Sequence, residues 1–289
     1  MTYPVRQFRR FAWPEPGASF ETPADHGLTP VPFRVVAADG LGIRCWRFTP
    51  RDPWGTVVVC HARGADKSRT LRLARLLYER DLEVVSFDFR GCGESDRPVR
   101  QWRGTLWDPL RDLDAVAAEA AKDTDRLALL GCSFGGNMVI AHGGTAPRRY
   151  AAVILDSTPV VRWVDMLDRQ FALERRDARH PAVRAGVDRA LSLVLAWWTR
   201  SNALYRHALR SVASEHMTPL MHIVGARESM FDVDESCRTL TEHCAGPLEV
   251  WRVPRGRHLT NHVVDPTGYA DRVTSFLTTA FGRARKEST

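Results

Sequence analysis

Ser133 is the residue whose surroundings most clearly predict chemistry. It follows an apolar run, and the sequence around it reads Gly-Cys-Ser-Phe-Gly-Gly over residues 131–136, after which the pattern becomes helical. A tight turn from a strand to a helix lifts such a hydroxyl off the sheet and brings it near the positive end of the helix dipole. Side chains at positions 131 and 135 would collide across the turn. The spacing therefore predicts a serine nucleophile.

A serine hydroxyl needs a base that takes its proton, and histidine is the usual base. His258 lies in the Gly-containing loop of residues 253–263, which reads Val-Pro-Arg-Gly-Arg-His-Leu-Thr-Asn-His-Val. This loop follows the last predicted strand and precedes the last predicted helix, so it is expected at the same edge of the sheet as Ser133. His258 is the predicted base, and His262, one turn later, is the alternative.

The acid that would orient the histidine is expected after the apolar run Leu220–Gly225. Glu228 comes three residues after the end of that run and is the first candidate. Asp232 is the fallback, and Asp156, at the end of the preceding strand, is the third. Asp234 is interpreted as the cap of the helix that starts there, which is a structural role. Glutamate serves in place of aspartate where the backbone leaves room for its additional methylene group.

The strands that would position these residues are predicted from short, continuous apolar runs. The runs cover residues 56–61, 83–89, 126–131, 151–156, 220–225 and 248–253. Continuous rather than alternating apolar runs indicate strands covered on both faces, and helical patterns lie between them. Two β-rich runs around an Asp-Gly turn at residues 33–48 predict a hairpin. The predicted fold class is therefore α/β, with a mostly parallel central sheet, an N-terminal hairpin and helices on both faces.

Residues 157–218 interrupt the alternation of strands and helices. They have a helical pattern, no convincing strand and several aromatic residues. An insertion at this point would cover the carboxyl edge of the sheet, where ligands bind in open α/β folds, and would act as a lid. Trp163, Trp197 and Trp198 are the candidate lining of a substrate pocket, the alternative being that they pack the lid onto the body. The predicted organisation is an N-terminal arm at 1–32, a core at 33–156 and 219–289, and a helical lid at 157–218.

The composition argues against several other classes of protein. The chain has 289 residues, 44% of them apolar, which is enough for one large core. Its formal charge is +7, but nearly all basic residues are arginines and they do not cluster, so nucleic-acid binding is not predicted. The six cysteines form no CxxC pair, and neither a secretory signal nor an apolar run of bilayer length is present. We expect a cytoplasmic protein with free thiols and without membrane contact, cofactor or metal. An oligomer is compatible with the sequence.

The chain order serine, acid, histidine is that of the α/β-hydrolases, and the sequence resembles this superfamily from Phe33 onward, most closely its serine esterase and acyl-peptidase-like branch. The resemblance is carried by residues 57–96, 131–136, 224–229 and 256–266. In the family, a His-Gly-x-Gly element after the third strand supplies one amide of an oxyanion hole. Here the element reads His61-Ala62-Arg63-Gly64, so the resemblance implies that the amides of Arg63 and Phe134 form the hole.

Two features depart from the family pattern or carry no assigned chemistry. Ala62 replaces the usual glycine, and its methyl group crowds the backbone of the oxyanion loop. The Arg63 side chain is unusual at this position, and it either reaches an acidic group of the substrate or faces solvent. Asp88 and the Arg-Gly-Cys-Gly-Glu-Ser loop at 90–95 match a family loop that shapes the entrance of the site.

The resemblance implies acyl transfer through an acyl-enzyme. Ser133 would attack a carbonyl carbon, His258 would take its proton, and Glu228 would hold the histidine in the correct tautomer. The aromatic lid favours a small-molecule ester or thioester with an apolar acyl or alkyl group. Two alternatives stay open: non-hydrolytic acyl transfer, cyclisation or elimination at the same site, and a receptor that binds ligand without catalysis.

Overall fold

The structure is a computed structural model that describes residues 3–6, 21–98, 106–143, 150–174, 181–214 and 218–282. Its centre is an eight-stranded sheet with the strand order β1-β2-β4-β3-β5-β6-β7-β8. The strands are β1 (Val31–Val36), β2 (Gly42–Phe48), β3 (Thr56–Cys60), β4 (Glu83–Phe87), β5 (Leu127–Cys132), β6 (Ala152–Asp156), β7 (Leu220–Gly225) and β8 (Leu248–Val253).

The pairing of the strands confirms the predicted fold class. β1 and β2 form an antiparallel hairpin, and β2 joins β4 in antiparallel pairing. All pairs from β4 to β8 are parallel. Every residue of β3, β4, β5, β6 and β7 is buried, which explains why these strands appear in the sequence as continuous apolar runs.

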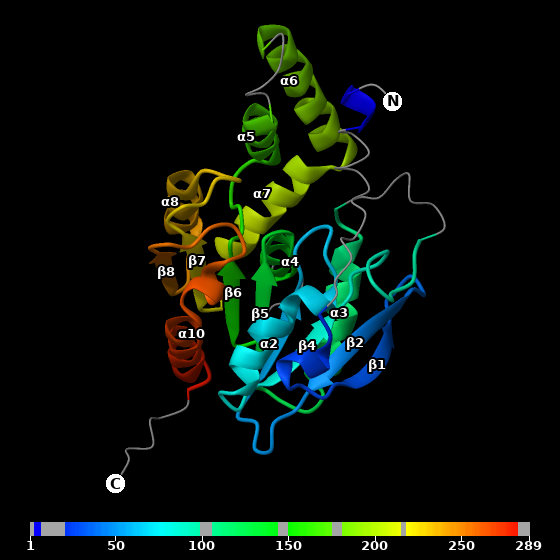
Figure 1. Cartoon of the computed structure of the whole chain (residues 1–289), viewed down its shortest axis with the longest axis vertical. Helices are drawn as coiled ribbons and strands as arrows, with labels where there is room; N and C mark the ends of the chain where they lie inside the picture. The colour runs from blue at the N-terminus through cyan, green and yellow to red at the C-terminus, as the bar shows by residue number, and fades with distance from the viewer. Residues whose placement is uncertain are drawn as a thin grey trace.

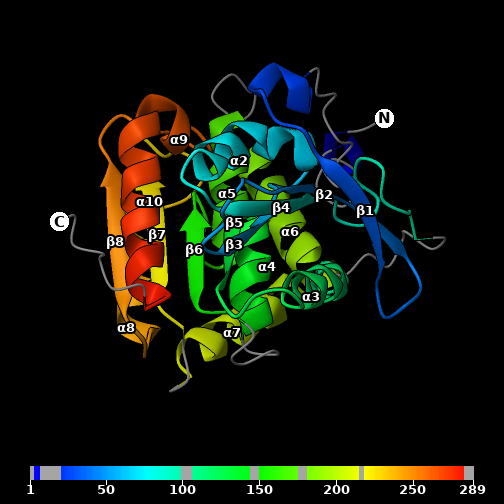
Figure 2. The same ribbon diagram turned by 90° about the horizontal axis from the view of Figure 1, so that it is seen from below.

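Helices cover both faces of the sheet. The helices of the described residues are η1 (Pro23–His26), η2 (Lys67–Thr70), α2 (Leu71–Tyr78), α3 (Pro109–Ala120), α4 (Phe134–Gly143), α5 (Trp163–Glu174), α6 (Pro181–Trp198), α7 (Ser201–Val212), α8 (Val233–His243), α9 (Asn261–Val264) and α10 (Pro266–Ala280). Figure 2 shows α2 and α10 on one side of the sheet and α3 and α4 on the other. Each side buries its own apolar core: Leu77 and Val273 pack on one face, Leu113 and Met138 on the other. These cores fix the strand ends that carry the site.

The segment 157–218 contains α5, α6 and α7. Figure 1 shows α5 and α6 beyond the carboxyl ends of β5 and β6, where the arrowheads of those strands point. Leu167 and Phe171 of α5 pack with Leu191 and Leu195 of α6 in a small core of their own. α7 packs against α4 and thereby connects these helices to the body. Within the described part of this segment there is no strand.

Half of the predicted N-terminal arm lies outside the described residues, since 1–2 and 7–20 are not among them. Its first described residues form a helical turn at 3–6, where the Tyr3 hydroxyl donates to Asp188 of α6 at 2.9 Å. In the described ranges, no helix is both long enough and apolar enough to cross a bilayer. The six cysteines are free thiols, and burial raises the pKa of Cys45 to about 12.

Candidate active site

Ser133 lies at the sharp turn between β5 and α4. Its φ is 51°, in the left-handed region, where an L-residue with a side chain is strained. The turn is held by a 2.8 Å hydrogen bond from the Ser133 N–H to the carbonyl of Asp156, at the end of the neighbouring strand β6. The strained backbone therefore holds the hydroxyl at the carboxyl edge of the sheet.

The glycines around Ser133 are required by close backbone contacts. A Cβ at Gly131 would overlap the backbone of Gly136, and one at Gly135 would lie 2.7 Å from the carbonyl oxygen of His61. Gly136 is a third such position, because a Cβ there would overlap the Thr158 side chain. The sequence argument predicted glycine at the first two positions but not at the third. Its explanation, a collision across the turn, holds for Gly131 only, since Gly135 and Gly136 are required by contacts with the distant residues His61 and Thr158.

The structure brings three of the candidate residues together. His258, in the loop after β8, has its Nε2 atom 3.0 Å from the Ser133 Oγ atom, and its Nδ1 atom 2.7 Å from the Glu228 Oε2 atom. A carboxylate only accepts hydrogen bonds, so the Nδ1 atom of a neutral His258 carries the proton. Its Nε2 atom is then free to accept the serine proton. This hydrogen-bonded chain has the geometry of a nucleophile, a base and an orienting acid.

Glu228 is fixed on both of its oxygen atoms. Its side chain has no exposed surface. While Oε2 faces His258, Oε1 accepts the N–H groups of Ser229 at 2.8 Å and of Met230 at 2.7 Å. The backbone after β7 thus folds around the carboxylate, and this local turn accommodates the additional methylene group of a glutamate.

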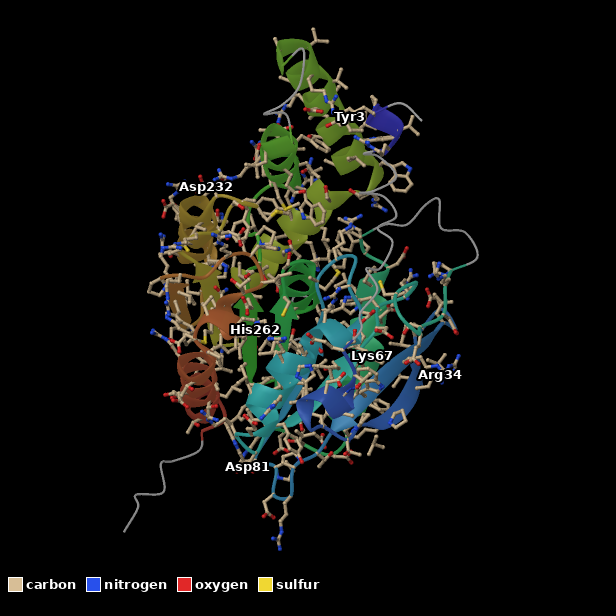
Figure 3. The ribbon with its side chains drawn as sticks, viewed as in Figure 1. Tyr3, Arg34, Lys67, Asp81, Asp232 and His262 are labelled. Carbon is tan, nitrogen blue, oxygen red and sulfur yellow. The ribbon has the colours of Figure 1, made fainter. Side chains whose placement is uncertain are left out.

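The alternative acid Asp232 has a different role. It is the N-cap of α8, and its Oδ1 atom accepts the N–H of Glu235 at 2.9 Å. Figure 3 labels it at the start of that helix. The interpretation of Asp234 as the cap is wrong: Asp234 instead forms an ion pair of 2.7 Å with Arg252. The two aspartates lie close in sequence, and only the backbone conformation decides which one caps.

The alternative base His262 and the third acid Asp156 face each other and not Ser133. The Nδ1 atom of His262 is 3.9 Å from Asp156 Oδ2. Asp156 is fully buried, and it accepts hydrogen bonds from Asn261 Nδ2 at 2.7 Å, the Ser157 hydroxyl at 2.9 Å and the Tyr269 hydroxyl at 2.9 Å. Burial acts to raise the pKa of Asp156, but nearby His262 and these donors outweigh it and hold the pKa below its ordinary value.

The hydrogen bonds around Asp156 position the histidine loop. The Ser157 hydroxyl, which donates to Asp156, also accepts the N–H of Leu259 at 3.0 Å, directly after His258. Leu259 has a φ of 59°, so the loop is held in a strained conformation beside the base. Sequence reasoning missed this network because its members are spread over three separate elements and form no local motif.

Replacing Tyr269 by phenylalanine is expected to destabilise the fold. The substitution removes the hydroxyl donor from a buried carboxylate, and such a loss costs about 1–3 kcal/mol. Urea unfolding followed by circular dichroism would measure the difference. Tyr78→Phe is the matched control: Tyr78 is half-buried, and its hydroxyl has no hydrogen-bond partner among the described residues. Equal losses of stability in both variants would show that the hydrogen bond from Tyr269 to Asp156 does not stabilise the fold.

The backbone amides of Arg63 and Phe134, which the resemblance implies for an oxyanion hole, have no acceptor within the described ranges. The loop that carries Arg63 is shaped by His61, whose Nε2 atom accepts the N–H of Phe89 at 3.1 Å. Its Nδ1 atom therefore donates to the carbonyl of Ala62 at 2.7 Å. Burial lowers the pKa of His61 and keeps the ring neutral, as this pairing requires. The two free amides have the donor chemistry of an oxyanion hole.

The loop at 90–95 is held to the start of η2 by ion pairs of the buried Lys67 side chain. Lys67 donates to Asp88 at 2.6 Å and to Glu94 at 2.5 Å, and its ammonium group lies over the ring of Trp46. Asp88 also accepts the backbone N–H groups of Lys67 and Glu94. These contacts give Asp88 a structural role, with no part in the chemistry at Ser133.

The three candidate tryptophans of the pocket differ in their surroundings. Trp163, at the start of α5, is buried, and its ring packs edge-to-face on Phe134 with 6.4 Å between centroids. Trp197 is 78% exposed, so assigning it to a pocket wall was wrong. Trp198 is half-buried. The helical pattern of α6 could not tell which side of the helix faces the body, because apolar residues occupy both sides.

Comparisons with known proteins agree with the α/β fold. A family described as alpha/beta hydrolase fold matches residues 55–183. An uncharacterized protein of Salmonella typhimurium, YfhR, is 34% identical over 151 residues, 46% of this chain and 51% of that protein. A monoacylglycerol lipase of Mycolicibacterium smegmatis is 32% identical over 111 residues, 38% of this chain and 39% of the lipase. The chain thus spans about half the length of the first of these relatives.

Solved structures match over a larger part of the chain. The esterase Pf2001 of Pyrococcus furiosus superimposes with a TM-score of 0.72 and 19% sequence identity, over 92% of this chain and 97% of the esterase. At this identity the similarity establishes the fold alone. In the described ranges, no three histidine, cysteine or acidic side chains come together in a way that could hold a metal ion.

Proposed function

Because the chain has the α/β-hydrolase fold, we propose that it is a serine hydrolase that cleaves a carboxylic ester or thioester through an acyl-enzyme. The observation that supports this most directly is the hydrogen-bonded chain from the Ser133 hydroxyl through His258 to the buried carboxylate of Glu228. A serine with such partners has a base for its proton and a fixed counter-charge for the imidazolium that forms.

In the proposed mechanism, the Ser133 Oγ atom attacks the carbonyl carbon of the substrate while its proton passes to the Nε2 atom of His258. The negative charge on the carbonyl oxygen is stabilised by the free amides of Arg63 and Phe134, which contribute about 3 kcal/mol each in comparable sites. His258 returns the proton to the leaving alcohol or thiol. A water molecule then attacks the acyl-enzyme, with His258 again acting as base.

The proposed substrate carries an apolar group close to the scissile bond. The buried rings of Phe134 and Trp163 lie next to each other beside Ser133 and offer an apolar surface. Helices α5, α6 and α7 are the lid in this proposal, because α5 carries Trp163 and lies beyond the strand ends. The lipase among the relatives acts, by its name, on monoacylglycerol, which is a carboxylic ester.

A fluorophosphonate probe and a series of p-nitrophenyl esters of increasing acyl length test this proposal. We expect the probe to label Ser133, as located by peptide mass spectrometry, and the esters to be hydrolysed with a preference for an intermediate or long acyl chain. Absence of labelling would contradict the assignment of the nucleophile. Labelling without turnover of any ester would contradict hydrolysis and favour acyl transfer, cyclisation or elimination, and full ligand binding without reaction would favour a receptor.

A further inference from the structure

The guanidinium group of Arg63 lies against the ring of Phe134, the residue after Ser133, and has no anionic partner among the described residues. Its central carbon lies 5.7 Å from the centre of the Trp163 ring and 6.0 Å from that of Phe134, the residue after Ser133. Within the described part of the chain, no carboxylate lies within hydrogen-bond or ion-pair distance of it. The two aromatic rings hold the side chain in position through cation–π contacts.

Arg90 shows how this protein pairs a buried arginine elsewhere. Its guanidinium binds Asp112 at 2.7 Å and Asp39 at 2.6 Å, and these bonds satisfy its donors. Arg63 is half-buried and has no such partner in the ranges that the structure describes. Burial lowers the pKa of Arg63 to about 10, so the group stays charged at neutral pH although its surroundings disfavour the charge. An anion bound beside the guanidinium would offset the unfavourable free energy of burying its charge.

An anion bound by Arg63 would lie close to the proposed site of reaction. The Arg63 backbone belongs to the loop of the proposed oxyanion hole, and its side chain contacts one ring that adjoins the nucleophile and another at the start of α5. A group that contacts the guanidinium therefore lies next to the acyl group bound at Ser133. A planar guanidinium matches a carboxylate with two parallel hydrogen bonds.

We propose that Arg63 binds a carboxylate of the substrate, so that the preferred substrates are esters or thioesters with a carboxylate a few bonds from the scissile carbonyl. This inference rests on the proposed hydrolase function. It narrows the substrate class to half-esters of dicarboxylic acids or esters of hydroxy acids. The two differ only in whether the acyl part or the alcohol part carries the charge.

The kinetic test compares esters that carry a carboxylate with neutral esters that lack it but have the same carbon chain or ring next to the scissile bond. The first pair is p-nitrophenyl hemiglutarate and p-nitrophenyl valerate, with the charge on the acyl part. The second is 4-carboxyphenyl butyrate and phenyl butyrate, with the charge on the alcohol part. In the wild type, we expect a higher kcat/KM for the charged member of one pair. Arg63→Gln should lower this charged-to-neutral ratio by about 10- to 100-fold, and Arg63→Lys by less.

The ratio is the informative quantity because any effect of the substitution on the oxyanion loop acts on both esters and cancels. Arg257→Gln is the matched control: Arg257 is exposed and directly precedes His258, so the same charge is removed near the site. Its ratio should stay close to that of the wild type. A wild-type preference for the neutral ester in both pairs, or an equal fall in the ratio for both variants, would overturn the proposal.

A binding measurement separates this inference from the proposed hydrolysis. Calorimetry would compare N-phenylglutaramic acid with N-phenylpentanamide, two amides that resist cleavage, on the wild type and on Arg63→Gln. We expect the acid to bind at least about 10-fold more tightly to the wild type only. Equal binding of both amides to the wild type overturns the role of Arg63. Tighter binding of the acid without turnover of any ester overturns hydrolysis and leaves the role of Arg63 supported.

Discussion

Replacing Ser133 by alanine is expected to lower kcat for ester hydrolysis by about 10⁵- to 10⁶-fold. The substitution removes the oxygen atom that lies 3.0 Å from His258 Nε2, and with it the covalent path through an acyl-enzyme. The free amides of Arg63 and Phe134 remain, so a residual rate about 10³-fold above that in water is expected from polarisation of the carbonyl. Initial rates with the preferred p-nitrophenyl ester would measure the loss.

Ser275→Ala is the control for this substitution. Ser275 lies exposed on α10, so the loss of its hydroxyl should leave kcat within about twofold of the wild type. Thermal melting of Ser133→Ala should show a folded protein, since alanine fits wherever serine does at this turn. A variant that is folded and still hydrolyses the ester at more than about a hundredth of the wild-type rate would show that another residue is the nucleophile.

Much of the candidate active site can be predicted from the sequence, because its residues lie in short local patterns. The Gly-Cys-Ser-Phe-Gly-Gly pattern after an apolar run is local, so the turn that presents Ser133 can be recognised without coordinates. Only Gly131 is required by a contact within this turn, because the carbonyl oxygen that a Cβ at Gly135 would meet belongs to the distant residue His61. His258 and Glu228 each follow a predicted strand. Parallel strands bring their carboxyl ends to one edge of the sheet. Glu228 and His258, which lie 95 and 125 positions after Ser133 in the chain, therefore meet it there.

The features of the site that could not be predicted from the sequence depend on contacts between distant elements. The hydrogen bonds of Asp156 come from α9 and α10 as well as from Ser157, so no spacing along the chain indicates them. The orientation of α6 is decided by packing on α5, and it leaves Trp197 exposed. The surroundings of Arg63 likewise arise from Trp163, which lies 100 residues later in the chain. Local patterns thus predict which groups react, whereas long-range packing decides which groups support them.

Glu228→Gln is expected to lower kcat by about 10⁴-fold while the structure of the site is kept. The Oε1 atom of Glu228 accepts two backbone N–H groups, so the oxygen atom of a glutamine will take that place and its NH₂ group will face His258. An amide donor there forces the Nδ1 atom of His258 to accept a hydrogen bond and moves its proton to Nε2. That tautomer cannot take the proton of Ser133.

Asp232→Asn is the matched comparison, because it makes the same change of carboxylate to amide four residues later. Asparagine caps a helix as well as aspartate does, so α8 and the activity should both be kept, with kcat within about twofold of the wild type. Rates for the two variants, measured with the same ester over pH 6–9, would show the contrast. Loss of activity in Asp232→Asn together with an active Glu228→Gln would mean that Asp232 orients the histidine during catalysis, and that the 2.7 Å contact of Glu228 with His258 has no catalytic role.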